Sequence, residues 1–511
     1  MSQTNTAPPS MRKTLGLTGV TMSAMALIAP GAFLWLTFQL QAANVGGATD
    51  MWTGIVTALI IAFLTALSFS ELARRYPEAG TGGSYYFAEK AFLDRNDPKY
   101  ARFARLAKFI TGWAAHLFYW VYPSVMVAFM VVLVTYILSQ FGVIVPIPAQ
   151  IAIAAGFSIL VGFIAVRGIT GSTRISLVIN IVQLICLIGF SVLAILFRLQ
   201  NPLGATEWVH PTASSILIPH NLSAMLFQST LAMLILVGFE SSTALAAESI
   251  NPQRDIPRGV VISLLIQGLF AYLLEYFAAN YALSEKLVVT TADGITLTGI
   301  AAAAASTAPI GDLAKLIGDA MLGQNGFALM LIVATTVALS ILGTTLAAIN
   351  TAVRISFAMS QDNEMPEVLG VLGRHATPHK AVWILVGVSA VLGAVGMKDI
   401  IALTGLTLAS NFGACLLYGL TCGMTFIAFF GRPEFNRFKH GVIPALGLLG
   451  NLGMMLTIVV IGLGTPGTSQ EATKLALRIM IAWAIVSGAY LLWNSGERGK
   501  PILPKENQIA S

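Results

Sequence analysis

The chain has 511 residues, of which 56% are hydrophobic and only 10% are charged. Soluble domains carry about 25% charged residues, so this composition excludes an ordinary soluble enzyme, a nucleic-acid-binding protein and a disordered protein. The net charge of +6 does not indicate nucleic acid, because the charges lie in segments between long apolar runs. Such runs predict an integral membrane protein embedded in a lipid bilayer.

Twelve apolar segments follow one another along the chain. Most hold roughly 20 apolar residues, the length with which a helix crosses the hydrocarbon core. They lie at residues 15–42, 51–73, 106–139, 147–166, 175–198, 222–248, 258–283, 325–357, 381–397, 400–430, 441–464 and 474–494. The first is too long for a signal-peptide core, so we expect no cleavage. The sequence predicts an all-α integral membrane protein with 12 transmembrane helices.

The lysines and arginines predict the orientation. With the N-terminus inside, 23 of the 29 fall in inside segments and 6 in outside segments. This bias is what the positive-inside rule requires. We therefore expect a multi-pass protein of the plasma (inner) membrane with both termini in the cytoplasm.

The outside loops at 199–221 and 284–324 are longer than the rest. Residues 299–320 of the second loop read GIAAAAASTAPIGDLAKLIGDA, which predicts a short amphipathic helix lying on the surface. All three cysteines fall in apolar runs, so no disulfide framework is implied. The sequence has no Walker A, HExxH or CxxC motif, which disfavours an ATP-driven pump and a zinc or haem enzyme. We expect no metal and no cofactor.

A proline interrupts the first apolar segment. Pro30 and Gly31 lie in the middle of this segment. Proline removes a backbone donor and clashes with the carbonyl four residues earlier, and in lipid the freed backbone groups need partners. The helix either kinks mildly here or unwinds and lines a cavity.

The sixth segment has a matching interruption. Gly238, Phe239 and Glu240 lie near its middle, which places a carboxylate at mid-membrane depth. Such a carboxylate is costly unless it faces water or a partner. Interruptions at corresponding positions of two five-span groups indicate a transporter site. The N-termini of unwound half-helices would offer backbone N–H groups to an anionic group.

Other polar residues within the spans are candidates for functional roles, and each also has a structural interpretation. Glu275 lies inside span 7, and an acid within a membrane span is by default a functional candidate. The alternative is an acid near the outer interface that is paired or reaches water. Tyr119 and Tyr122 are three residues apart in span 3 and share a helix face. An aromatic face beside a carboxylate suits an ammonium group, whereas packing is the alternative. The charged loop residues could form the salt bridges of an inner gate; the alternative is a solvated surface at the membrane. These residues are Glu71, Arg74, Arg75, Glu248, Arg254 and Asp255.

Four stretches together resemble the amino acid–polyamine–organocation (APC) superfamily of permeases. They are APGAF at 29–33, SFSELARRYPEAGTGGSYYFAEKAF at 68–92, GFESSTALAAESINPQRDIPRG at 238–259, and NTAVRISFAMSQDNEMPEVL with HATPHKA between 350 and 381. The resemblance covers most of residues 15–385, and the second and third stretches are the most specific.

The resemblance implies a LeuT-type fold, in which two groups of five helices are inverted about an in-plane pseudo-two-fold axis and two further helices follow. The expected parts are a cytoplasmic N-terminal tail (1–14), a ten-helix transport core (15–430), two accessory helices (431–494) and a cytoplasmic tail (495–511). It also implies substrates among amino acids, their decarboxylation products and polyamines, moved by exchange or proton symport.

The resemblance also assigns roles to residues. Ala29, Pro30 and Gly31 match the backbone loop that receives a substrate carboxylate, and Glu240 matches a glutamate tied to gating and protonation. The predicted substrate-binding residues are Ala29, Pro30, Gly31, Tyr119, Tyr122, Leu234, Gly238, Phe239 and Glu240. Gating or proton coupling is predicted for Glu240 and Glu275.

Three positions depart from the family pattern. Pro30 has no N–H to offer a carboxylate. Gln183 stands where proton-coupled relatives carry a lysine, and it cannot titrate. Leu234 and Ala348 stand where arginine–agmatine exchangers carry aromatic gates.

The predicted function is a secondary transporter, a permease or antiporter that moves amino acids or their amine derivatives by alternating access. An alternative is a permease for carboxyl-free amines or polyamines, which Pro30 favours. A remote alternative is a polytopic membrane enzyme or a proton-channel subunit, which would need acid and histidine clusters across several spans. We expect no enzymatic activity. The expected partners are a small-molecule substrate and the lipid bilayer, with no nucleic acid, and a homodimer is left open.

Overall fold

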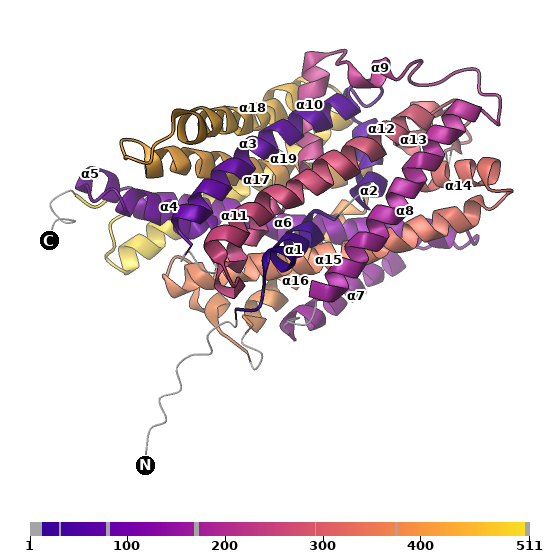
Figure 1. Ribbon diagram of the computed structural model, residues 1–511. Coiled ribbons are helices and arrows are strands. Elements are labelled where there is room, and N and C mark those ends of the chain that lie inside the picture. Colours follow the sequence, from indigo (N-terminus) through magenta and orange to yellow (C-terminus); the bar gives the residue numbers. More distant parts are fainter. Residues whose placement is uncertain are drawn as a thin grey trace.

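A computed structural model describes residues 13–29, 32–77, 82–167, 173–291, 293–373 and 377–505. In these residues twelve helical segments are long and apolar enough to cross a membrane, which confirms the predicted number. The helices are α1 (Leu17–Ile28), α2 (Ala32–Ala42), α3 (Met51–Arg75), α4 (Ser84–Leu93), α5 (Pro98–Ala101), α6 (Ala104–Ser139), α7 (Ile147–Val166), α8 (Thr173–Gln200), α9 (Ser214–Leu217), α10 (Leu222–Ala232), α11 (Pro252–Leu264), α12 (Leu273–Ala282), α13 (Gly299–Ala305), α14 (Pro309–Met321), α15 (Gly326–Gln361), α16 (His379–Gly396), α17 (Ile400–Phe429), α18 (Ile443–Gly464) and α19 (Thr468–Glu497) (Figure 1).

Three of the described spans, 6, 7 and 11, contain 3-10 or π-helical stretches in place of regular α-helix. Span 6 consists of α10 followed by the 3-10 helices Met233–Ile235 and Phe239–Glu248. Span 7 consists of α11, the π-helix Leu265–Tyr272 and α12. A second π-helix, Arg437–Val442, precedes α18, and the 3-10 helix Glu367–Gly370 follows α15. Stretches of this kind often mark functional positions in helices.

An even number of spans places both described ends on the same side of the bundle. We call this side the terminal face; it also carries α4, α5 and the connection between α17 and α18 (Figure 1). The opposite side, the far face, carries α9, α13, α14 and a hairpin of β1 (Val288–Thr290) and β2 (Thr296–Thr298).

The burial of the spans shows which of them form the core. In the most apolar part of α17, 78% of the residues are buried, against 11% in α19. α6 and α17 pack against each other at the centre of the bundle, and α15 packs against α6. The helix α19 lies at the periphery, where its apolar residues suit contact with lipid.

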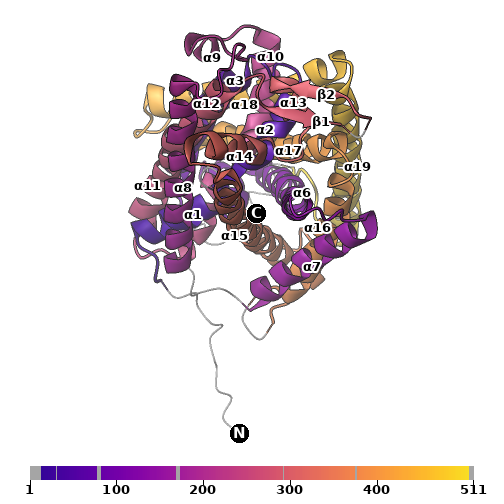
Figure 2. The ribbon, with the colours of Figure 1, turned by 90° about the vertical axis from the view of Figure 1, so that its right-hand side faces the viewer.

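The far-face loop differs from the single surface helix that we predicted. It forms two helices, because Pro309 begins a new helix after the break at Ser306. One side of α14 is buried, including Ile310 and Leu313. Seen from the far face, α13 and α14 lie over α2, and the hairpin lies beside α13 (Figure 2).

The three cysteines are free thiols within the bundle. Cys415 and Cys422 are buried on α17, and Cys186 is half-buried on α8. None of them lies in a loop of either face.

Candidate functional site

Span 1 is broken where the sequence predicts an interruption. Helix α1 ends at Ile28, Ala29 has the left-handed φ of 54°, and α2 begins at Ala32. The predicted residues Pro30 and Gly31 lie outside the described residues. A helix that ends inside a membrane leaves its last four carbonyl groups without intrahelical partners.

Side chains from other spans donate to the carbonyl groups at this end of α1, including Met25 O, which also accepts from Ala29 N. The hydrogen bonds run from Gln267 Nε2 to Met25 O (2.9 Å), from Thr344 Oγ1 to Ala26 O (3.0 Å), from Tyr122 Oη to Leu27 O (3.3 Å), and from Tyr272 Oη to Ile28 O (2.9 Å) and Ala29 O (2.5 Å). The donors belong to spans 3, 7 and 8. The end of α1 is therefore held by three other helices, and Tyr122 serves as one of its donors.

Span 6 is broken at the predicted glycine. Gly238 has a φ of 122°, a conformation that side chains rarely tolerate, and the 3-10 helix Phe239–Glu248 follows it. A Cβ atom built on Gly238 would lie 3.0 Å from the side chain of Leu27 and 3.1 Å from that of Ile28. The two broken spans therefore meet at this glycine.

The hydroxyl groups after the break bond to their own segment. Ser241 Oγ donates to Gly238 O (2.6 Å) and Ser242 Oγ donates to Phe239 O (2.8 Å). The next residue continues the pattern, because Thr243 Oγ1 donates to Glu240 O (2.7 Å). These contacts satisfy carbonyl groups of a segment that lacks α-helical hydrogen bonds.

Glu240 lies at the junction of the two breaks. Its side chain is buried, and its carboxylate accepts hydrogen bonds from Tyr119 Oη (2.7 Å), Tyr418 Oη (2.6 Å) and Gly238 N (2.9 Å). Three donors thus hold the carboxylate in place. The structure brings the predicted Tyr119 and Glu240 together, and it adds Tyr418 from span 10.

Sequence reasoning missed Tyr418. It is one tyrosine within the apolar run of span 10, and no motif marks it. Its ring also lies beside that of Phe239, with centroids 5.2 Å apart, and both rings pack against Phe69. The predicted residue Leu234 is buried in the 3-10 turn before the break.

A narrow pocket adjoins Glu240 on the side of the terminal face. It is lined by Gly82, Gly83, Ser84, Tyr85, Ala115, Tyr119, Glu240, Ser241, Thr243, Ala244, Thr351, Ile355 and Leu417. The lining comes from α4 with its preceding loop and from spans 3, 6, 8 and 10. The pocket connects Glu240 with the loop that carries the family-like glycines.

Charged groups close this pocket toward the terminal face. Lys108 Nζ lies 2.7 Å from Glu89 Oε2 and 2.7 Å from Asp362 Oδ2, and it is 4.8 Å from the ring centroid of Tyr85. An ion pair also joins spans 8 and 6, since Arg354 Nη2 lies 2.6 Å from the carboxylate of Glu248. Of the predicted inner-gate residues, Glu248 takes part in this closure.

Packing closes the opposite route toward the far face. Trp35 of α2 and Tyr136 of α6 stack edge to face, with centroids 5.7 Å apart. A Cβ atom on Gly311 of α14 would lie 2.5 Å from the Trp35 ring and 2.8 Å from Tyr136. The Tyr136 hydroxyl donates to Asp312 Oδ1 (2.7 Å). Helix α14 therefore covers the site from this side.

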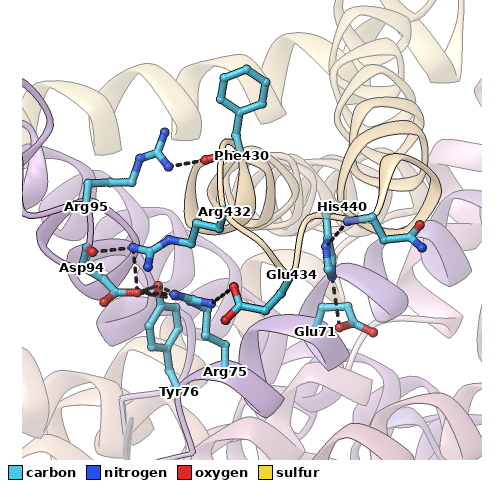
Figure 3. A network of polar contacts seen from close by, with 10 residues as sticks. Glu71, Arg75, Tyr76, Asp94, Arg95, Phe430, Arg432, Glu434 and His440 are labelled. Carbon is cyan, nitrogen blue, oxygen red and sulfur yellow. Dashed lines mark hydrogen bonds and ion pairs between the residues drawn. The ribbon is translucent and has the colours of Figure 1, made fainter.

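A separate polar network joins the end of α3 to the connection between α17 and α18 (Figure 3). The carboxylate of Asp94 lies 2.7 Å from Arg75 Nη2 and 3.2 Å from Arg432 Nη2. Burial acts to raise the pKa of Asp94, but the hydrogen bond from Arg75 and the charges of Arg75 and Arg432 outweigh it and lower the pKa below its usual value. At the edge of the network, His440 Nε2 lies 3.3 Å from Glu71 Oε2. The predicted residues Glu71 and Arg75 thus hold the terminal face together.

Glu275 does not join the site at Glu240. It lies in the first turn of α12, directly after the π-helix, and it is fully buried. Within the residues that the structure describes, no group of three histidine, cysteine, aspartate or glutamate side chains could hold a metal ion.

A helical bundle in which two discontinuous spans meet at a buried polar site has the architecture of the secondary transporter folds. The sequence model of the family described as amino acid permease matches residues 13–486. The chain belongs to this family, and the resemblance to the APC superfamily is confirmed.

Several curated proteins are similar to the chain. The low-affinity putrescine importer PlaP of Escherichia coli K12 is 26% identical over 284 residues, which cover 54% of this chain and 56% of PlaP. The branched-chain amino acid permease BcaP of Bacillus subtilis is 24% identical over 475 residues, covering 88% of this chain and 89% of BcaP. The L-methionine/branched-chain amino acid exporter YjeH of E. coli is 27% identical over 281 residues, covering 51% and 54%. The chain thus spans little more than half the length of PlaP and YjeH.

Proposed function

We propose that the protein is a secondary transporter that moves amino acids or their amine derivatives across the membrane by alternating access. The observation that carries the proposal is the buried Glu240 carboxylate at the junction of two broken spans, beside a pocket that is closed toward both faces. Alternating access needs a site of this kind, which either face can open. The family match and the three relatives named as permeases or transporters support the same function.

The electrostatics of the junction favour a cationic group. The C-terminal end of α1 carries the negative end of a helix dipole, and Glu240 adds a carboxylate a short distance away. The Tyr119 and Tyr418 hydroxyls hold this carboxylate and can yield to a substrate ammonium. We assign the recognition of the substrate amino group to Glu240 and the gating of the pocket to these two tyrosines.

The second candidate function is transport of amines without a carboxylate, such as polyamines. It is favoured by Pro30, which has no N–H for a substrate carboxylate, and by the similarity to a putrescine importer. For the amino acid candidate, the backbone of Ala29, Pro30 and Gly31 would receive the carboxylate. Both candidates use Glu240 in the same way.

The bias of lysine and arginine supports a cytoplasmic terminal face in the plasma membrane. The relatives are named as an importer and an exporter, which points away from an enzyme.

The division of the chain into four parts and the homodimer stay predictions. A green fluorescent protein fused to either terminus tests the orientation. The reporter becomes fluorescent in the cytoplasm but not when it is exported unfolded, so we expect fluorescence from both fusions.

Uptake by proteoliposomes that contain only this protein tests the function. Radiolabelled putrescine, L-leucine and L-methionine are offered to the wild type, Glu240→Gln and Tyr418→Phe. A hydrogen bond to a charged group contributes about 1.5–3 kcal/mol, so we expect Glu240→Gln to lower kcat/KM by about 10- to 100-fold. Glu471→Gln, which removes an exposed acid of α19, is the matched control.

The compound that the wild type takes up distinguishes the two candidates. Uptake of leucine or methionine supports amino acid transport, and uptake of putrescine alone supports amine transport. Wild-type affinity in Glu240→Gln would contradict the assignment of Glu240, and a wild type that moves none of the compounds tested would contradict the proposed function.

A further inference from the structure

Glu275 is a second buried acid in the bundle, and it lacks the donors that Glu240 has. Its side chain is 0% exposed, and neither carboxylate oxygen accepts a hydrogen bond from any described residue. Glu240 shows the opposite arrangement, since its two oxygens share three donors. The two acids therefore differ in how their oxygens are satisfied.

Among the side chains that the structure describes, the elements around Glu275 bring no charge to it. Helices α1, α2 and α9 contain no charged residue. On α8 and α3, and just before α3, the charged residues whose side chains are described lie at the helix ends. Arg198 at the end of α8 lies 3.8 Å from the centroid of the Trp208 ring and donates to the backbone of Pro211. Asp50, which precedes α3, accepts from His220 N (2.8 Å).

The remaining charges on α3 lie at its other end, at Glu71, Arg74 and Arg75. The titratable groups that belong to α12, to the π-helix or to the interior of α8, besides Glu275, are the phenols of Tyr272, Tyr276 and Tyr281 and the thiol of Cys186. The imidazole of His210 lies beside Asn280 of α12, and burial lowers its pKa. None of these groups supplies a positive charge. An ionised carboxylate in such a place costs several kcal/mol.

The residues beside Glu275 hold both halves of broken span 1. Tyr272, one turn earlier, donates to Ile28 O and Ala29 O at the end of α1. Tyr276, the next residue, shares a hydrogen bond with Thr37 of α2. A movement of span 1 away from span 7 must break these contacts, and it would expose the neighbouring face of α12 to water.

We propose that Glu275 is a proton-binding site, separate from the substrate site at Glu240, that keeps its proton while Tyr272 and Tyr276 hold span 1. When span 1 moves away, water reaches Glu275 and takes the proton, and the return of span 1 requires a new proton. Substrate movement and proton movement are then linked through the broken helix. This inference rests on the proposed function, since it assigns the coupling ion of the same transport cycle.

Two transport assays on the full-length protein test the link. Proteoliposomes with the wild type, Glu275→Gln or Glu275→Asp receive radiolabelled putrescine, L-leucine or L-methionine, whichever the wild type moves. One assay measures accumulation driven by a pH gradient, and the other measures exchange against unlabelled substrate at equal pH. Glutamine mimics the protonated acid, so Glu275→Gln should keep exchange and lose accumulation, with a final ratio of one. Glu275→Asp keeps a titratable group and should restore accumulation.

A measurement without substrate tests the bound proton itself. A group that is protonated when folded and ionised when unfolded makes stability fall as the pH rises. The midpoint of thermal unfolding of the purified wild type should therefore fall between pH 5 and pH 8 by more than that of Glu275→Gln. Because this readout needs no transport, it remains valid if the proposed function fails.

The outcomes separate the two ideas. Accumulation by Glu275→Gln at the wild-type level, or a wild type that does not respond to a pH gradient, would overturn the coupling role. Identical pH dependence of unfolding in wild type and Glu275→Gln would overturn the proton site. Absence of any uptake by the wild type would instead overturn the proposed function and leave the unfolding measurement to judge Glu275.

Discussion

The two broken spans meet at one point, but they are stabilised in different ways. The carbonyl groups at the end of α1 receive hydrogen bonds from spans 3, 7 and 8, through Tyr122, Tyr272, Gln267 and Thr344. The backbone of the break in span 6 is stabilised within its own segment, by the conformation of Gly238 and by hydroxyl groups bonded three residues back. Spans 3 and 10 reach this break only through the Glu240 side chain.

This difference indicates how each break responds when the bundle rearranges. Span 1 depends on its neighbours, so a shift of span 3, 7 or 8 changes the partners of its carbonyl groups. Span 6 carries its break with it and keeps its shape. We infer that span 1 is the responsive half of the site and span 6 the fixed half, with Glu240 on the fixed half.

The largest expected effect comes from Gly238→Ala. Alanine at a φ of 122° is strained, and its Cβ would press on Leu27 and Ile28. Strain of this kind costs about 1–3 kcal/mol, and it would displace Glu240. We expect a lower midpoint of thermal unfolding and uptake below about a tenth of the wild-type rate, which is about 1.4 kcal/mol of barrier.

Gly189→Ala is the control for this change. Gly189 lies on α8, and a Cβ atom there would meet nothing within 4 Å. If Gly238→Ala behaved like Gly189→Ala in both measurements, the break in span 6 would not depend on its own backbone.

A smaller effect is expected from Tyr272→Phe, which leaves the buried Ile28 carbonyl at the end of α1 without this donor, whereas the Ala29 carbonyl still accepts from Ala32 N. An unsatisfied buried group costs about 1–3 kcal/mol, although span 1 can move to relieve part of the cost. We expect a lower unfolding midpoint and a changed KM for uptake, with Tyr490→Phe on the peripheral α19 as the control. Wild-type values for Tyr272→Phe would show that span 1 does not depend on its neighbours.

The smallest effect is expected at the polar network of the terminal face, which stabilises neither break directly. The pKa of Asp94 is lowered, so its ion pairs stabilise the folded protein above the unfolded-state pKa of about 3.9, and this stabilisation is lost as the pH falls through the lower pKa of the folded state. Partly exposed ion pairs contribute about 0–1 kcal/mol.

Thermal unfolding of Asp94→Asn between pH 3 and pH 7 measures this contribution. The variant should be slightly less stable than the wild type at pH 7, and the difference should shrink below about pH 4. A loss at pH 7 as large as that of Gly238→Ala would mean that the network, and not the broken spans, dominates stability.

Most of the fold could be predicted from the sequence, because length and composition determine which segments cross a bilayer. The break beside Glu240 was also predictable, since a carboxylate in an apolar run is costly and marks its own position. Tyr119 was predicted as a site residue, but its hydrogen bond to Glu240 was not. Tyr418 and Gln267 were not predictable. Each lies in an apolar run without a local signal, and its role arises only when helices distant in sequence pack together.

Local irregularities of the helices were also missed. The π-helix before Glu275 and the second helix of the far-face loop depend on tertiary packing, which overrides local propensity. The assignment of a substrate carboxylate to Pro30 and Gly31 stays a prediction, because these residues lie outside the described part of the chain.

The position of the cysteines has a practical consequence. Cys415 and Cys422 are buried on α17, and Cys186 lies half-buried within α8 at bilayer depth. Thiol reagents in water react with exposed thiolates, and neither face offers them a natural cysteine. The natural sequence is therefore a suitable background for spin labels or fluorophores at single introduced cysteines, and distances between α14 and the α3–α4 loop could be followed while substrate is added.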